Sequence, residues 1–137
     1  MRLAPRRHGT LALVDVSYRP SDNDRADPGE VVWAWVPYEE DPSRGKDRPV
    51  LVIGSDDDIL LALPLSSQDH DRDARQEASE GRFWMDIGSG PWDPRGRPSE
   101  VRLNRLLRLR PDEVRREGAA LAPALFDAVV EAISAYE

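Results

Sequence analysis

Short apolar runs, separated by polar stretches, fill most of the chain before residue 110. Each run is rich in aliphatic, β-branched or aromatic residues, which is typical of short β-strands. The run Val50-Leu51-Val52-Ile53 lies between Pro49 and Gly54. We place Pro49 at the first position of its strand, where the missing N–H breaks no ladder hydrogen bond. The pattern predicts strands at residues 30–36, 49–53, 59–65, 82–87 and 100–104, with residues 106–109 continuing the sheet.

The periodicity changes near the C-terminus. From Pro123 onward, apolar residues recur at the three- and four-residue spacing of one helix face: Leu125, Phe126, Val129, Val130 and Ile133. Pro111 and the acids after it predict a short helical turn at residues 111–114. Twelve prolines and nine glycines imply many turns and disfavour an all-helical fold. We expect a mainly β fold, a small curled sheet with a helix packed against it.

Polar segments separate these elements. Residues 1–28 are interpreted as a mostly irregular arm, and residues 37–47 as a charged loop. Residues 68–80 form a second polar connection with room for one helical turn, and residues 88–96 form a loop rich in glycine and proline. A chain of 137 residues is expected to bury one core. We therefore predict an N-terminal arm at 1–28 and a single domain at 29–137.

Composition limits the chemistry. The absence of cysteine excludes disulfides, thiolate metal sites and cysteine nucleophiles. No apolar run is long enough for a bilayer span or a signal-peptide core, so we expect a soluble cytoplasmic protein with no membrane partner. The net charge of −7 is uneven, because residues 82–116 hold nine arginines against five acids. A basic segment in an acidic chain is compatible with phosphate binding on one face, although such runs are more often solvated surface.

The second polar connection imitates a calcium-binding loop. Counted from Asp69, acids fall at positions 1, 3, 5, 9 and 12, but position 6, which requires glycine, is Ala74. We therefore predict no metal site and no cofactor, and we keep a metal-dependent nuclease using this loop as a third alternative. His8 and His70 are the only histidines, which excludes a multi-histidine metal centre. A serine triad would have to use His70 as its base.

The four tryptophans are candidates for stacking on single-stranded bases. Alternation puts Trp33 and Trp35 on the same face of one strand, which favours a shared place in the core. Trp92 lies between Pro91 and Asp93 in the loop rich in glycine and proline. We therefore expect Trp92 to be the exposed stacking platform.

A cation and a hydroxyl form the remaining candidate pair. Arg48 lies where the charged loop meets a buried strand, and Ser66 lies at the end of the next strand. If these strands are neighbours, the guanidinium could hold a phosphate in a fork while the hydroxyl donates or relays a proton. Such a pair needs no metal. Spacing alone favours a surface arginine and a turn serine.

The order of these motifs resembles the PemK/MazF family of toxins from bacterial type II toxin–antitoxin pairs. The resemblance covers about residues 29–135 and rests on four motifs: Gly29-Glu30-Val31-Val32-Trp33, Arg48-Pro49-Val50-Leu51-Val52-Ile53, Pro64-Leu65-Ser66-Ser67 and Val101-Arg102-Leu103-Asn104-Arg105-Leu106. It implies an SH3-like small antiparallel β-barrel with a C-terminal helix, and a homodimer. It also implies metal-independent endoribonuclease cleavage of single-stranded RNA, such as mRNA, by attack of the ribose 2′-OH. A cognate antitoxin would be the protein partner, and we predict no DNA partner for the toxin alone.

The resemblance also assigns roles to residues. The family's catalytic arginine and threonine correspond to Arg48 and to Ser66, which keeps the hydroxyl and lacks the methyl group. The residues expected to bind RNA are Arg44, Lys46, Ser67, Trp92, Arg102 and Arg105. An arginine with a pKa above about 12 is a poor proton acceptor, so we expect Arg48 to stabilise the phosphorane charge and leave the base unassigned. The alternative from another class is a catalytically silent SH3-like binding module.

Overall fold

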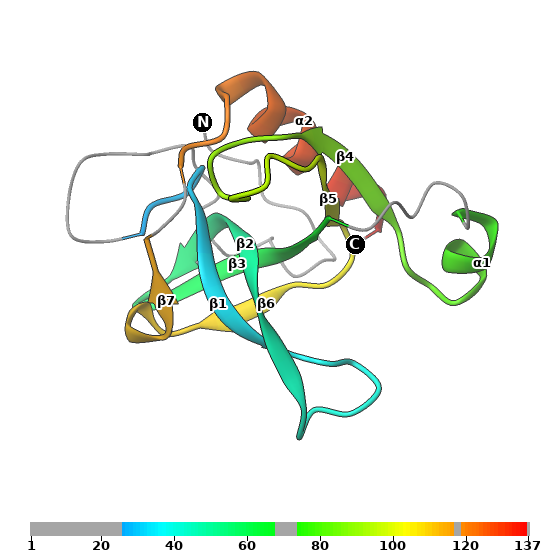
Figure 1. The fold of residues 1–137 in the computed structure, drawn as a ribbon, viewed down its shortest axis with the longest axis horizontal. Helices are drawn as coiled ribbons and strands as arrows, with labels where there is room; N and C mark the ends of the chain where they lie inside the picture. Colours follow the sequence, from blue (N-terminus) through cyan, green and yellow to red (C-terminus); the bar gives the residue numbers. More distant parts are fainter. Residues whose placement is uncertain (1–25, 68–73, 117–118, 137) are drawn as a thin grey trace.

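The computed structural model describes residues 26–67, 74–116 and 119–136 (Figure 1). Its strands are β1 (Val31–Pro37), β2 (Gly45–Asp56), β3 (Ile59–Ser66), β4 (Trp84–Gly88), β5 (Ser99–Arg102), β6 (Leu107–Leu109) and β7 (Val114–Arg115). Its helices are α1 (Ala74–Ser79) and α2 (Pro123–Ile133), with short 3-10 turns at Pro111–Glu113 and Ser134–Tyr136. The predicted mainly β fold with a C-terminal helix is confirmed. The two-residue strand β7, which pairs with β1, was not predicted.

Strand β3 connects the two parts of the sheet. The strand order is β4-β5-β3-β2-β1-β7, and every pairing is antiparallel. One edge of β3 pairs with β2, while the other edge pairs with β6 at residues 60–62 and with β5 at residues 65–66. Among the described residues these pairings do not close into a ring. The small barrel implied by the resemblance is therefore an open sheet in this chain.

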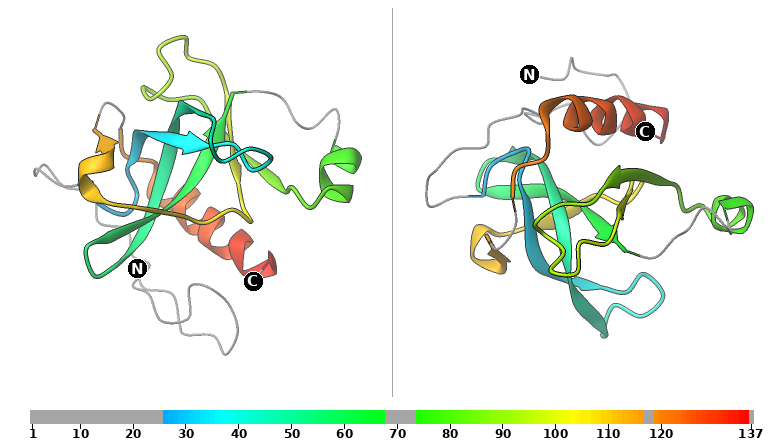
Figure 2. Two further views of the ribbon diagram at one scale, coloured as in Figure 1. Left: turned by 90° about the horizontal axis from the view of Figure 1, so that it is seen from below. Right: turned by 45° about the horizontal axis from the view of Figure 1, so that its top comes forward.

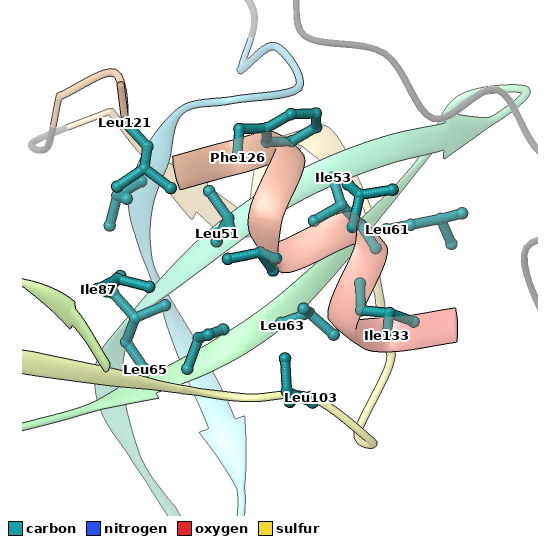
Figure 3. Close-up of a cluster of buried hydrophobic side chains, with 14 of the residues drawn as sticks. Leu51, Ile53, Leu61, Leu63, Leu65, Ile87, Leu103, Leu121, Phe126 and Ile133 are labelled. Atoms are coloured by element: carbon teal, nitrogen blue, oxygen red, sulfur yellow. The ribbon is translucent and has the colours of Figure 1, made fainter. Parts of the chain in front are cut away.

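Helix α2 covers one face of the central strands. Its predicted apolar face is confirmed, because Phe126, Val129, Val130 and Ile133 are all buried. They form one cluster with odd-numbered residues of β2 and β3 (Figure 3): Leu51, Ile53, Leu61, Leu63 and Leu65. Side chains alternate between the two faces of a strand, so the even-numbered residues of β3, and those of β2 as far as Val52, point away from α2. A register shift between Val52 and Gly54 ends this numbering in β2.

The face away from α2 has its own apolar cluster and a polar end. Its buried residues include Val50 and Val52 of β2, Ala62 of β3 and Leu109 of β6. On the same face, Arg48 lies two residues before Val50 in β2, and Ser66 is the last residue of β3. The hairpin formed by β1 and β2 extends away from α2 at this end (Figures 1 and 2). The candidate residues therefore lie where the second apolar cluster gives way to solvent.

Two details of the predicted strands are wrong. Strand β2 begins at Gly45, so Arg48 and Pro49 lie within the strand and not at its start. The reason is tertiary, because the hairpin pairs β1 with β2 as far as Pro37 and Gly45. Pro49 pairs with Trp33, but the ladder between β2 and β3 begins only at Val50, so the proline lies just outside that second ladder.

The predicted shared core position of Trp33 and Trp35 is also wrong. Trp33 is half-buried, whereas Trp35 is 57% exposed. Both rings lie on one face of β1, but β7 pairs with β1 only at Trp33 and Ala34. Trp35 lies beyond this pairing, toward the tip of the β1–β2 hairpin.

Several predictions fall on residues outside the described ranges. Most of the N-terminal arm at 1–28 and the acidic run at 69–73 belong to this group, as do both histidines. Of the second polar connection, the described part contains the single short helix α1, as the pattern allowed. Among the described residues, neither helix is long and apolar enough to span a membrane.

Candidate active site

Arg48 and Ser66 face each other at the polar end of the sheet. The strands β2 and β3 are neighbours, and their ladder pairs Val50 with Pro64. Continuing that register places Arg48 opposite Ser66, just beyond the last ladder pair. The Arg48 Nη1 donates a long hydrogen bond of 3.5 Å to the carbonyl oxygen of Leu65, the residue before Ser66. The strands that carry the candidate cation and hydroxyl are therefore neighbours, which is the condition that the sequence hypothesis required.

The Arg48 guanidinium is only partly satisfied by the protein. Its Nε is buried and has no hydrogen-bond partner among the described residues. Burial lowers the pKa of Arg48, and the nearby Arg105 lowers it further. Two half-buried cations close together repel each other, and an anion between them relieves that repulsion. The geometry and charge of this position therefore suit a phosphate.

Arg105 is held beside Arg48 by the hairpin. It lies between β5 and β6, and its Nη2 donates a hydrogen bond of 2.6 Å to the carbonyl oxygen of Pro37 at the end of β1. Burial lowers the pKa of Arg105 as well. This contact joins residues 68 apart in the sequence, so sequence reasoning named Arg105 but could not place it beside Arg48.

Arg102 is occupied by a carboxylate of the same chain. Its Nη1 and Nη2 donate to the two carboxylate oxygens of Glu39 at 2.5 and 3.3 Å, and its Nε donates to Asn104 Oδ1 at 2.7 Å. The guanidinium carbon lies 5.9 Å from the centre of the Trp84 ring. The hydrogen bond from Arg102 lowers the pKa of Glu39, so the ion pair is lost only as pH falls through that lowered value. A phosphate could bind Arg102 only by displacing Glu39.

An open groove runs along this end of the sheet. It has a volume of about 550 Å³ and is lined by Glu39, Glu40, Glu80, Arg82 and Arg102. Arg82 pairs with Glu80 and with Glu77 of α1, and Glu77 also accepts a hydrogen bond of 2.9 Å from Trp84 Nε1. These contacts attach α1 to β4. The groove therefore presents both signs of charge, with the acids supplied largely by loops.

The three remaining predicted contact residues are exposed. Lys46 lies two residues before Arg48 in β2, so alternation puts it on the same face. Arg44 lies in the turn that ends the loop, where its carbonyl oxygen accepts a hydrogen bond from the Tyr38 N–H at 2.9 Å. Ser67 directly follows β3. All three are accessible to a ligand that approaches Arg48.

The predicted exposure of Trp92 is wrong. Its side chain is only 3% exposed, its Nε1 donates a hydrogen bond of 2.9 Å to Ser99 Oγ, and its carbonyl oxygen accepts one of 3.1 Å from Trp33 Nε1. A Cβ at Gly90 would collide with its ring. Turn residues predict a loop correctly, but they do not say whether that loop folds back onto the core. Trp92 is a structural residue and offers no stacking surface.

Sequence reasoning missed two acidic residues at this site. Glu39 pairs with Arg102 across 63 residues, a contact that no local pattern could reveal. Glu100 is 4% exposed and pairs with Ser66 in the ladder between β3 and β5. A signal for Glu100 did exist, because the alternation Glu100-Val101-Arg102 puts the acid and the arginine on one face of a half-buried strand.

The described part of the chain contains no candidate metal centre. Among these residues, no group of three or more carboxylates or histidines is placed to hold a metal ion. The first three acids of the calcium-like loop at 69–80 lie outside the described residues, whereas its last two are described. Those two, Glu77 and Glu80, both pair with Arg82.

The comparisons with known proteins identify a family for this chain. Residues 27–136 match a family model described as PemK-like, MazF-like toxin of type II toxin–antitoxin system. The matched segment covers the whole sheet and helix α2. The comparison with curated proteins gave no match.

Proposed function

Because the chain belongs to the PemK-like, MazF-like toxins of type II toxin–antitoxin systems, we propose that it is a metal-independent endoribonuclease that cleaves single-stranded RNA. Arg48 and Ser66 are its catalytic residues. The ribose 2′-OH attacks the adjacent phosphorus, and the bond from phosphorus to the 5′-oxygen breaks. One product ends in a 2′,3′-cyclic phosphate and the other begins with a 5′-hydroxyl.

One observation carries the proposal: the partly buried Arg48 guanidinium faces Ser66 across the end of the sheet and keeps a buried Nε without a partner among the described residues. A guanidinium fixed at the position where negative charge develops is the kind of electrostatic stabilisation that usually contributes most to catalysis. Arg105 adds a second cation beside it. RNA phosphate supplies the anion that this arrangement lacks.

A second candidate function has an observation of its own. The Arg102 guanidinium is held by Glu39, and three glutamates line the groove, which disfavours a polyanion there. A catalytically silent SH3-like binding module would keep such a groove for a protein partner. The two functions differ in whether RNA is cut.

The test incubates the purified chain with long single-stranded RNA in the presence of EDTA. We expect discrete cuts that end in cyclic phosphate. Arg48→Ala should slow cleavage by about 10²- to 10³-fold, the usual effect of removing one charge-stabilising donor. Ser66→Ala should also impair cleavage. Arg108→Ala is the matched control, because Arg108 is an exposed arginine that pairs with Asp56 at the other end of β2.

Each outcome separates the alternatives. An Arg48→Ala variant that cuts as fast as the wild type overturns the catalytic assignment. No cuts over a range of RNAs favours the silent module, and cleavage that EDTA abolishes favours the metal-dependent nuclease. In cells, expression without an antitoxin should arrest growth, and Arg48→Ala should relieve the arrest.

Further parts of the proposal concern partners and location. Membership of a toxin–antitoxin family implies a cognate antitoxin. We propose that the antitoxin tail occupies the RNA site and contacts the basic segment at 82–116, that the toxin is a cytoplasmic homodimer, and that it has no DNA partner of its own. The exposed Trp35 is compatible with an interface between two copies. A monomeric mass by light scattering would contradict the dimer.

A further inference from the structure

Glu100 belongs to a row of polar side chains that crosses four strands. The β3–β5 ladder pairs Ser66 with Glu100, and the β4–β5 ladder pairs Glu100 with Asp86. The continued β2–β3 register places Arg48 on the other side of Ser66. Directly opposite residues of antiparallel strands point to the same face. The cation, the hydroxyl and the two carboxylates therefore share the face away from α2.

Burial distinguishes Glu100 from the other acids of this face. Glu100 is 4% exposed, whereas Asp86 is exposed and Ser66 is half-buried. Opposite residues in an antiparallel ladder have Cβ atoms about 5 Å apart, which lets a glutamate carboxylate accept a hydrogen bond from a serine hydroxyl. Because Glu100 is buried, its carboxylate acts on a ribose through a neighbouring side chain. The β3–β5 ladder places Ser66 next to it.

We propose that Glu100 is the proton acceptor for the cleavage step and acts through the Ser66 hydroxyl. This inference rests on the proposed function. It assigns the base that the arginine cannot supply, because a guanidinium stays protonated near neutral pH. Glu100 is thus a positioning residue that orients the Ser66 hydroxyl and receives its proton.

The proton path balances. As the 2′-oxygen bonds to phosphorus, its proton passes to Ser66 Oγ, and the Ser66 hydroxyl proton passes to Glu100. The bond from phosphorus to the 5′-oxygen breaks, and that oxygen keeps the electron pair and takes a proton from water. Glu100 returns its proton to solvent. Arg48 remains charged throughout and stabilises the phosphorane.

Charged groups on three strands face Glu100 and bear on its titration. Asp86 lies directly opposite on β4, Arg48 lies beyond Ser66 on β2, and Arg102 lies two residues along β5 on the same face. Glu39 reaches this group from the loop by pairing with Arg102. Asp86 is therefore the carboxylate from which an experiment must separate Glu100.

The test measures the single-turnover cleavage rate of the full chain as a function of pH. Glu100→Gln keeps the shape of the side chain and removes the base. We expect a loss of about 10²-fold or more in rate, the typical contribution of a general base, and loss of the fall in rate toward acid pH. Binding of an RNA with 2′-deoxyribose at the cleavage position should not change. Glu100→Asp should recover part of the rate. Asp86→Asn should keep the wild-type rate near neutral pH and keep the fall in rate toward acid pH, moved to lower pH because a neighbouring negative charge is removed.

The possible failures are distinguishable. If the wild type cuts RNA and Glu100→Gln keeps its rate and pH profile, the assignment of Glu100 is overturned while the proposed function stands. The assignment of Glu100 is also overturned, while the proposed function stands, if Asp86→Asn abolishes the fall in rate toward acid pH. If Glu100→Gln does not fold, Ser66→Ala provides the test. Removing the hydroxyl interrupts proton transfer to Glu100, so the fall in rate toward acid pH must also be lost. If the wild type cuts no RNA, both proposals are overturned.

Discussion

At the scale of single residues, Arg48 combines burial with incomplete pairing. Desolvation lowers its pKa, yet the hydrogen bond to the Leu65 carbonyl oxygen is long and the buried Nε has no partner among the described residues. A buried donor without a partner costs folding free energy, typically about 1–3 kcal/mol. That cost is reversed when an anion binds, so the residue is less satisfied in the free protein than it would be with phosphate.

Trp92, in contrast to Arg48, is buried and hydrogen-bonded, so its substitution should mainly lower the stability of the fold. Trp92→Ala removes a buried ring and its hydrogen bond to Ser99, so we expect the free energy of unfolding to fall by about 3–5 kcal/mol. Urea denaturation measures the change. Arg95→Ala, an exposed substitution in the same loop, should change it by less than about 0.5 kcal/mol. Unchanged stability with weakened RNA binding would show that Trp92 serves the ligand after all.

At the scale of elements, two long-range contacts hold the β1–β2 hairpin against the rest of the sheet. Glu39 in its loop binds Arg102 of β5, and Arg105 binds the carbonyl oxygen of Pro37. Helix α2 packs on the sheet through a separate apolar cluster on the other face. The helix therefore supports the strands that position the site, while the hairpin shapes the site itself.

The supporting role of α2 predicts a large effect at its centre. Phe126 is fully buried against the sheet, and Phe126→Ala should lower the free energy of unfolding by about 3–5 kcal/mol. That is a large share of the roughly 5–15 kcal/mol that stabilises a domain, so the melting temperature should drop steeply. Thermal denaturation followed by circular dichroism measures it. Glu131→Ala on the exposed side of α2 is the control, and an equal effect there would contradict a packing origin.

At the scale of the whole molecule, an acidic chain carries a cationic site. The net charge is −7, but Arg48 and Arg105 lie together on the face away from α2, with Arg102 close by. Local charge rather than net charge governs the approach of a polyanion to its site. The glutamates of the groove oppose that approach and should make binding modest at physiological salt.

The three arginines set the expected salt dependence of RNA binding. If each neutralises one phosphate, the logarithm of the association constant should fall with the logarithm of salt concentration with a slope of about −2. Fluorescence anisotropy with a labelled, uncleavable RNA measures the slope. Arg105→Gln should make the slope shallower by about 0.7. A slope near zero in the wild type would rule out phosphate contacts by these residues.

The sequence by itself determined most of the strands, the apolar face of α2 and the choice of Arg48 and Ser66 as candidate residues. These features depend on local patterns, because alternation and helical periodicity are set by neighbouring residues. Proline and glycine marked most of the element ends. The same local logic found the family motifs. It missed β7 and misplaced the start of β2, where pairing with β1 extends the strand to Gly45.

Only the tertiary structure decided which side chains are exposed and which charges meet. Trp92 is buried because its loop folds back onto Trp33, whereas Trp35, on the same face of β1 as Trp33, is 57% exposed. The pairing of Arg102 with Glu39 and the row from Arg48 to Glu100 join residues that are tens of positions apart in the chain. Such contacts depend on strand order and register, which no local pattern encodes. The sequence thus determined the groups that the site contains, and the fold decided which of them act together.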